Sequence, residues 1–361
     1  MTSTTARERM QANSYTSGRL PRWFAPALFG ASLVIGMSVI ALLAAAEVLP
    51  EFPIVLAVLV GVVLYDVLIT VIASAAEGRR AATDRLFTSL VITAFVIALL
   101  PLISLLYTVV VNGAARFDLT FFTNSMRSVI GEGGGALHAI VGTLQITALA
   151  TIISVPVGLF AAIYLVEYGR GPLKRAITFF VDVMTGIPSI VAGLFAYALF
   201  ALFFGEGVRM GFAGSVALAV LMIPVVVRSS EEMLKLVPDE LREASYALGV
   251  PKWRTVAKVV LPTAGAGIVT GITLAIARVI GETAPLLIVA GFTSSMNYNP
   301  FSERMQSLPV FVYTQYANPG SQVEFYLERA WAGALSLILI VMALNLIARL
   351  ITRYFTPRTR R

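Results

Sequence analysis

The chain has 361 residues, of which 58% are hydrophobic and only 13% are charged. Ordinary soluble domains are about 45–50% apolar and about 25% charged, so this composition excludes the soluble class and favours a membrane protein. The absence of cysteine excludes a disulfide framework and a thiolate metal site, and the single histidine, His138, argues against histidine-based metal clusters and catalysis.

Eight continuous apolar runs are near or above the roughly 20 residues that a helix needs to cross a bilayer. They do not alternate apolar with polar residues, so the fold class is predicted to be all-α and polytopic rather than a barrel. The first run is too long for a cleavable signal peptide, so we expect a retained helix. The runs cover about 25–47, 53–74, 87–111, 138–165, 177–203, 213–230, 263–291 and 331–351.

The basic residues predict the orientation, because Lys and Arg accumulate in cytoplasmic loops. With both termini in the cytoplasm, the segments on that side hold most of the 27 basic residues. The loops 112–137 and 292–330 then lie outside. The net charge of +7 is therefore explained by topology and requires no nucleic acid. The opposite side keeps only Arg116, Arg127, Arg209, Arg304 and Arg329.

The first two spans carry little beyond apolar bulk and one carboxylate, Asp66, which we expect to pair with a neighbouring helix. A short link with Pro50 and Pro53 joins them into a hairpin. We therefore divide the chain into residues 1–80, a polar N-terminus with a two-helix hairpin, and residues 81–361, a core of six helices. No P-loop pattern occurs in the sequence, so we do not expect this chain to hydrolyse ATP as an enzyme.

A polar, helix-forming island interrupts the apolar core between the sixth and seventh spans. It contains Glu243-Ala244-Ser245 and Gly249, followed by Leu261-Pro262. This spacing resembles the cytoplasmic EAA loop of ABC importer permeases, with serine in place of the second alanine. In that family the loop docks the ATPase, so the resemblance implies a coupling helix near 232–250. Pro238 predicts where the helix begins, and Gly249 predicts where it ends.

The seventh span contains charged residues at membrane depth, where they are costly and usually functional. Arg278 lies roughly 20 Å in from Thr263 at about 1.5 Å of rise per residue. Glu282 follows four residues later, which predicts one shared helix face. Thr283-Ala284-Pro285 then breaks the helix. An internal salt bridge is one interpretation; the other is a substrate pathway, since a guanidinium group can bind two oxygens of an oxyanion.

Together these segments resemble the PstA-type permease of the phosphate-specific ABC importer. The most specific stretch runs from Ala277 to Pro285, since the PstC-type partner subunit usually continues with Met-Ala where this chain has Ala284-Pro285. The resemblance covers roughly residues 87–355, and residues 1–80 depart from it. Further similar stretches are Gly142-Thr143-Leu144, residues 161–168, residues 186–191 and Ser307-Leu308-Pro309-Val310.

The resemblance implies a multi-pass permease of the bacterial plasma membrane that imports inorganic phosphate. It implies a PstC-like permease partner, a PstB-type ATPase dimer that uses ATP and Mg, and an extracytoplasmic phosphate-binding protein. This chain itself is expected to hold no cofactor or metal. The resemblance implies that Arg278, Glu282 and Thr283 line the substrate pathway. The alternatives are an ABC permease for molybdate, sulfate or phosphonate, an ion-coupled secondary transporter, and a membrane enzyme.

Overall fold

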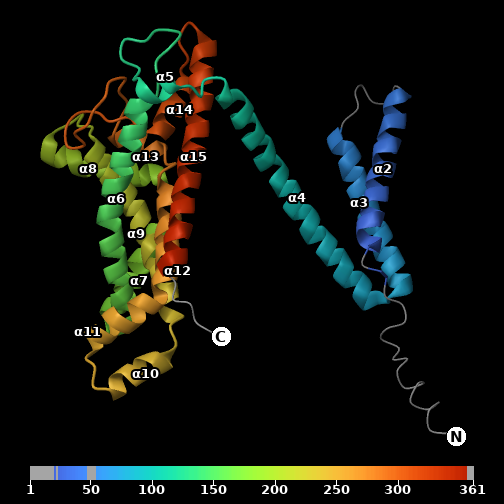
Figure 1. Ribbon diagram of the computed structural model, residues 1–361, viewed down its shortest axis with the longest axis horizontal. Helices are drawn as coiled ribbons and strands as arrows, with labels where there is room; N and C mark the ends of the chain where they lie inside the picture. The colour runs from blue at the N-terminus through green and yellow to red at the C-terminus, as the bar shows by residue number, and fades with distance from the viewer. Residues whose placement is uncertain (1–19, 22, 47–53, 356–361) are drawn as a thin grey trace. The chain divides into compact units, whose positions relative to one another are not determined.

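A computed structural model describes residues 20–21, 23–46 and 54–355, and within these ranges every regular element is a helix. The chain forms two compact units, Met1–Leu106 and Tyr107–Arg361 (Figure 1). The all-α prediction is confirmed. The polar N-terminus and the link with Pro50 and Pro53 lie outside the described residues. The domain boundary near residue 80 stays a prediction, because one long helix, α4 (Arg79–Ala114), belongs to both units.

The first unit contains a pair of packed helices, α2 (Phe24–Ala45) and α3 (Ile54–Ala76). Glycine permits the close approach, because a Cβ atom on Gly36 would lie 2.6 Å from the backbone nitrogen of Gly61. Asp66 of α3 is half-buried, and its buried Oδ1 has no hydrogen-bond partner among the described residues. The expected helix-to-helix pairing of this carboxylate is therefore not seen within the first unit.

The second unit is a helical bundle in which α9 packs against α6 and α12, and α12 packs against α15. Helices α10 and α11 lie at one end of the bundle, and α5 and α14 lie at the other (Figure 1). Its helices after α4 are α5 (Leu119–Thr123), α6 (Leu137–Ile163), α7 (Gly171–Thr185), α8 (Ser189–Phe204), α9 (Gly211–Lys235), α10 (Asp239–Ala247), α11 (Lys252–Thr255), α12 (Leu261–Val279), α13 (Ala284–Val289), α14 (Leu308–Ala317) and α15 (Val323–Phe355).

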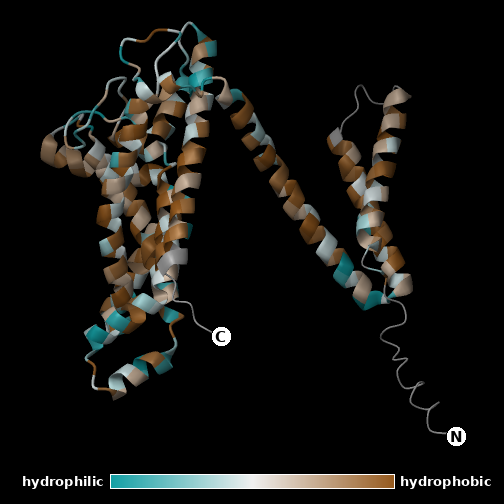
Figure 2. Ribbon diagram, viewed as in Figure 1, coloured by the Kyte–Doolittle hydropathy of each residue, from teal (hydrophilic) through white to brown (hydrophobic). Residues whose placement is uncertain are grey.

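Two π-helical turns interrupt the helices at the end of the bundle that carries α10. The turn η1 (Tyr164–Tyr168) ends α6, and η2 (Val256–Val260) joins α11 to α12. Such turns are rare and recur at functional sites. Figure 2 shows the long helices as mainly hydrophobic and this end as rich in hydrophilic residues.

Helix α9 is the central element of the bundle, and most of its membrane window is buried. Its small residues let neighbours approach closely, as is usual between membrane helices. A Cβ atom on Gly214, for example, would lie 3.0 Å from the side chain of Leu286 on α13 and 3.2 Å from that of Ala290, which follows α13. The main core lies where α6, α9, α12 and α13 meet and contains Ile146, Ala150, Leu218, Met222, Val226, Ala275 and Val279.

Seven described helices are long and apolar enough to cross a membrane, and an eighth span results if one bent pair is counted together. That pair, α7 and α8, covers the predicted span 177–203, and the structure adds a sharp bend that the prediction did not include. The two helices differ in direction by 110° at Gly186-Ile187-Pro188. The reason is Pro188, which lacks an amide hydrogen and forces the preceding residue out of the helical region.

Candidate functional site

The predicted site residues form two groups, which the nearly continuous helical stretch α11–η2–α12 connects. The coupling residues lie on α10, just after it and at the start of α12, whereas Arg278 lies in the last turn of α12. Seventeen residues at about 1.5 Å of rise separate Leu261 from Arg278 by roughly 26 Å. One helical element therefore connects the two groups.

A short helix, α10, lies in the segment where the coupling helix was predicted. It begins after Pro238, whose fixed φ suits a helix start, and it carries Asp239 and Glu240 in its first turn. At the other end, Gly249 has φ +73°, its amide donates to Tyr246 O (2.9 Å), and the next amide donates to Ser245 O (3.2 Å). These two bonds form a Schellman motif, which requires a left-handed residue.

The outward face of α10 consists of the residues predicted to dock an ATPase. Glu243, Ala244 and Gly249 are all exposed, and Leu248 has 83% of its surface exposed. No neighbouring atom lies within 4 Å of a Cβ placed on Gly249. Exposed apolar side chains outside the membrane spans are typical of a protein interaction surface.

The serine that replaces the second alanine of the EAA pattern faces inward. Ser245 is buried, and its hydroxyl lies 2.8 Å from the hydroxyl of Thr255 on α11. This hydrogen bond ties the two arms of the loop together. Sequence reasoning treated the serine as a departure from the pattern and missed this contact, although a buried hydroxyl normally has such a partner.

The closing Leu261-Pro262 pair starts α12. Pro262 is exposed in the first turn, where its missing amide hydrogen costs nothing. Leu261 packs against a second core cluster at the α10 end of the bundle, which contains Ala162, Leu234, Val237, Val260, Ala264 and Ile268. The pair therefore joins the loop firmly to the bundle.

Arg278 and Glu282 do not share a helix face, so that prediction is wrong. Helix α12 ends at Val279, and the amide of Glu282 donates to Val279 O over 3.1 Å in a turn. Because Pro285 lacks an amide hydrogen, a new helix, α13, starts at Ala284 and the old one stops earlier than expected. Among the described residues, Arg278 is exposed and makes no ion pair with the half-buried Glu282.

The third residue predicted for the pathway, Thr283, stands at the start of α13. It is half-buried, and its hydroxyl donates to Gly281 O over 3.4 Å. All three pathway residues therefore lie in or beside the break between α12 and α13. Arg278 continues an exposed stripe of α12 that also includes Thr263, Thr270 and Leu274.

Helix α8 packs against the start of α13, beside the break between α12 and α13. A Cβ atom on Gly193, in the second turn of α8, would lie 2.7 Å from Cα of Pro285. Helix α8 thus crosses directly over the first turn of α13. Sequence reasoning predicted only the break at Pro285 and missed this contact, since 92 positions separate Gly193 from Pro285 in the chain.

Sequence reasoning also missed two ionic clusters near the α10 end. Arg228 of α9 is paired with Asp182 of α7 and with Glu231 (2.8 Å), which also pairs with Lys235 (2.7 Å). The second cluster joins Arg242 of α10 to a buried carboxylate at the end of α6. A basic residue directly before the EAA pattern was the only available signal for the second cluster.

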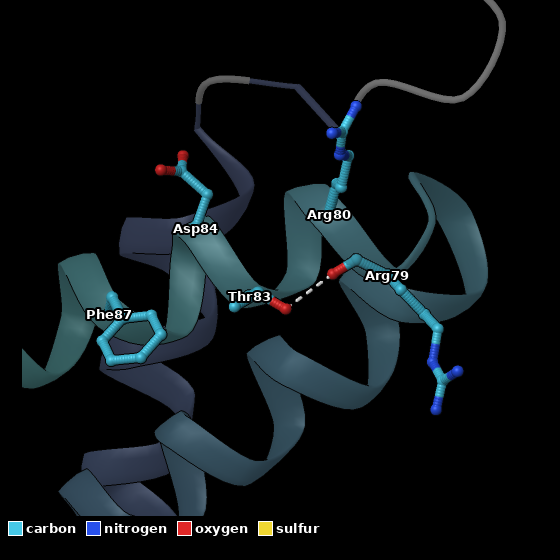
Figure 3. A pocket seen from close by; sticks show the side chains of 5 residues that line it. All are labelled: Arg79, Arg80, Thr83, Asp84 and Phe87. Atoms are coloured by element: carbon cyan, nitrogen blue, oxygen red, sulfur yellow. Dashed lines mark hydrogen bonds between the residues drawn. The ribbon is translucent and has the colours of Figure 1, made fainter.

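A surface hollow of about 440 Å³ lies at the start of α4, in the first unit. Figure 3 shows that the side chains of Arg79 and Arg80 point in different directions. The hydroxyl of Thr83 donates to Arg79 O over 2.8 Å. The two guanidinium groups therefore do not converge on one anion. Within the described ranges, no group of three or more His, Cys, Asp and Glu residues could hold a metal ion.

Solved structures with a similar fold come from ABC transporters. An inward-facing structure of the MetNI methionine ABC transporter matches with a TM-score of 0.51 at 22% identity, covering 61% of this chain and 96% of that chain. A bacterial alginate ABC transporter in complex with its periplasmic protein matches with a TM-score of 0.54 at 12% identity, covering 76% and 96%. At these identities the likeness shows the fold alone.

Sequence relatives extend over most of the chain. The PstA 1 phosphate transport system permease protein of Mycobacterium tuberculosis is 48% identical over 288 residues, which are 78% of this chain and 91% of that protein. The PstA protein of Yersinia pestis is 40% identical, covering 76% and 92%. The family model "Binding-protein-dependent transport system inner membrane component" matches residues 154–361. This chain therefore belongs to that family of ABC importer permeases, and within it to the PstA type.

Proposed function

We propose that this chain moves inorganic phosphate into the cytoplasm as one permease subunit of an ATP-driven importer. The relatives named above, at up to 48% identity, support phosphate as the substrate. The observation that carries the proposal is Arg278, an exposed cation in a membrane-spanning helix beside a backbone break. A guanidinium group is always charged and binds oxyanions through two oxygens.

The exposure of Arg278 supports a partner on that face of α12. A charge directed at lipid near the bilayer centre costs several kcal/mol, so such residues face protein or water. A PstC-like permease subunit that covers the stripe of Thr263, Thr270, Leu274 and Arg278 would enclose the charge in a shared pathway. Glu282, close by in the chain, would then limit how tightly the pathway holds phosphate, because transport requires release as well as binding.

The remaining partners follow from the two ends of the bundle. The exposed face of α10, with Glu243, Ala244 and Gly249, would dock a PstB-type ATPase dimer, and that ATPase would use ATP and Mg. An extracytoplasmic phosphate-binding protein would deliver phosphate at the end that carries α5 and α14. We propose that α10 and both termini face the cytoplasm, as the distribution of basic residues favours.

Uptake of labelled phosphate by cells that depend on this chain tests the proposal. Arg278→Gln should abolish uptake while the protein still assembles, because the shape is largely kept and the charge is lost. Arg278→Lys should be partly active at best, because a point charge replaces a planar fork. Arg175→Gln is the matched control, since Arg175 is exposed on α7 and lies away from the break.

Two outcomes would contradict this pathway. Normal uptake by the double variant Arg278→Gln, Glu282→Gln would show that the two charges only balance each other. Competition by excess sulfate, molybdate or phosphonate that matches competition by unlabelled phosphate would show that the substrate is another oxyanion.

A further inference from the structure

The guanidinium group of Arg242 forms a buried ion pair that links α10 to α6. Its Nε and Nη2 atoms lie 3.1 and 3.0 Å from Oε1 of Glu167, a residue of the π-turn η1. The side chains are only 12% and 5% exposed. Exposed ion pairs contribute little, whereas a buried pair is strongly disturbed when one partner is removed. The ion pair between Arg242 and Asp239 contributes little, because the side chain of Asp239 is 86% exposed.

The same guanidinium group also binds the end of α9. Nη2 donates to Leu234 O over 2.9 Å, and Nη1 donates to Val237 O over 2.5 Å. The last carbonyl groups of a helix have no partner within the helix, so Arg242 supplies donors that α9 itself lacks. One side chain of α10 therefore holds the ends of two core helices, α6 and α9.

Glu167 also binds the other arm of the loop. The ammonium group of Lys252, at the start of α11, donates to the backbone oxygen of Glu167. It also lies 5.0 Å from the ring centre of Tyr168. Helix α11 leads through η2 into α12, which carries Arg278. Helices α10 and α11, on the two sides of the loop, thus both contact Glu167 at the end of α6.

We propose that Arg242 and Glu167 are positioning residues that carry movement of α10 to the core helices. This inference rests on the proposed docking of the ATPase on α10. A movement of α10 without breakage of the buried pair must displace the ends of α6 and α9 together. Without the pair, α10 keeps its contacts with the end of α9, with η2 and with Thr255, but loses its side-chain link to α6. ATP hydrolysis would then continue with less movement of the pathway helices.

The test uses the complete complex, with partner permease, ATPase and binding protein, reconstituted in liposomes. It measures phosphate transported per ATP hydrolysed, together with the amount of ATPase that co-purifies. Glu167→Gln keeps the shape and removes the charge. The Glu167→Gln complex should still bind the ATPase, but the amount of phosphate transported per ATP hydrolysed should fall by roughly tenfold. That factor is within the range typical of coupling between sites.

Glu231→Gln is the matched control. Glu231 is a similarly buried carboxylate, 7% exposed, and its two cationic partners, Arg228 and Lys235, lie on its own helix, α9. It should leave phosphate per ATP unchanged even if thermal stability falls. If Glu167→Gln lowers thermal stability but leaves the phosphate transported per ATP unchanged, the inference is overturned, because the ion pair would then have only a structural role.

The double variant Glu167→Met, Arg242→Met covers the case in which Glu167→Gln fails to assemble. It removes both buried charges and fills the space with apolar side chains, a change that buried ion pairs often tolerate. The complex should assemble and remain poorly coupled. Full coupling would refute the inference. If the wild-type complex shows no phosphate-stimulated ATP hydrolysis, the proposed function fails, and that outcome is distinct from failure of the positioning role.

Discussion

Replacement of Gly249 by leucine should separate the docking role of the EAA loop from its folding. Gly249 has φ +73°, a conformation that costs other L-residues roughly 1–2 kcal/mol. Because no atom lies within 4 Å of its Cβ position, no steric cost within the chain is added. That cost is a modest part of a typical stability of about 5–15 kcal/mol, so the variant should still fold. A leucine side chain on the docking face should nevertheless exclude the ATPase.

The assay is binding of the ATPase to the solubilised permease, measured alongside thermal unfolding of the permease alone. We expect Gly249→Leu to weaken binding at least about tenfold, which corresponds to about 1.4 kcal/mol. Gly207→Leu is the control, since Gly207 also has positive φ (+79°) and open space but precedes the opposite end of α9. The reasoning is refuted if the two variants lower ATPase binding equally, or if Gly249→Leu binds normally.

Three further outcomes follow from the contacts. Ser245→Ala should lower the free energy of unfolding by about 1 kcal/mol, measured by thermal denaturation, because the hydroxyl of Thr255 loses its partner; an unchanged midpoint would contradict the bond. Gly193→Val should cost about 1–3 kcal/mol through overpacking against Pro285, and a variant as stable as the parent would exclude that contact. A cysteine at Leu119, 78% exposed, should react with a membrane-impermeant thiol reagent in intact cells whose outer layers have been permeabilised. A cysteine at Leu236, 72% exposed, should react only after the cells are lysed. The reverse labelling pattern would show that the topology is inverted.

The sequence alone was sufficient to predict helix ends where a single proline or glycine determines the local backbone conformation. Pro238 and Gly249 predicted both ends of α10, because their conformational restrictions act within one or two residues. Pro285 likewise predicted a break in the seventh span. The position of that break was misjudged, since α12 stops at Val279 and the proline is placed in the first turn of a new helix.

Features that depend on distant segments could not be derived in this way. The size of the bend at Pro188 depends on the packing of α8 over α13, which Gly193 permits. The pair formed by Glu167 and Arg242 joins residues 75 positions apart, and neither carries a local signal of its partner. Continuous apolar runs identify membrane helices, but they do not identify which charged side chains at the helix ends form pairs.

The π-turn η2 has a consequence for how the two ends of α12 are aligned. A π-turn contains an extra residue relative to an α-helix, and one residue corresponds to about 100° of rotation around the helix axis. The direction in which Arg278 points, relative to the loop that contains Gly249, is therefore set by the number of residues in Val256–Val260. Loss of one residue there would rotate the guanidinium group by about 100° relative to the loop. The number of residues in this turn, rather than their side chains, therefore fixes the angular register between the two ends of α12.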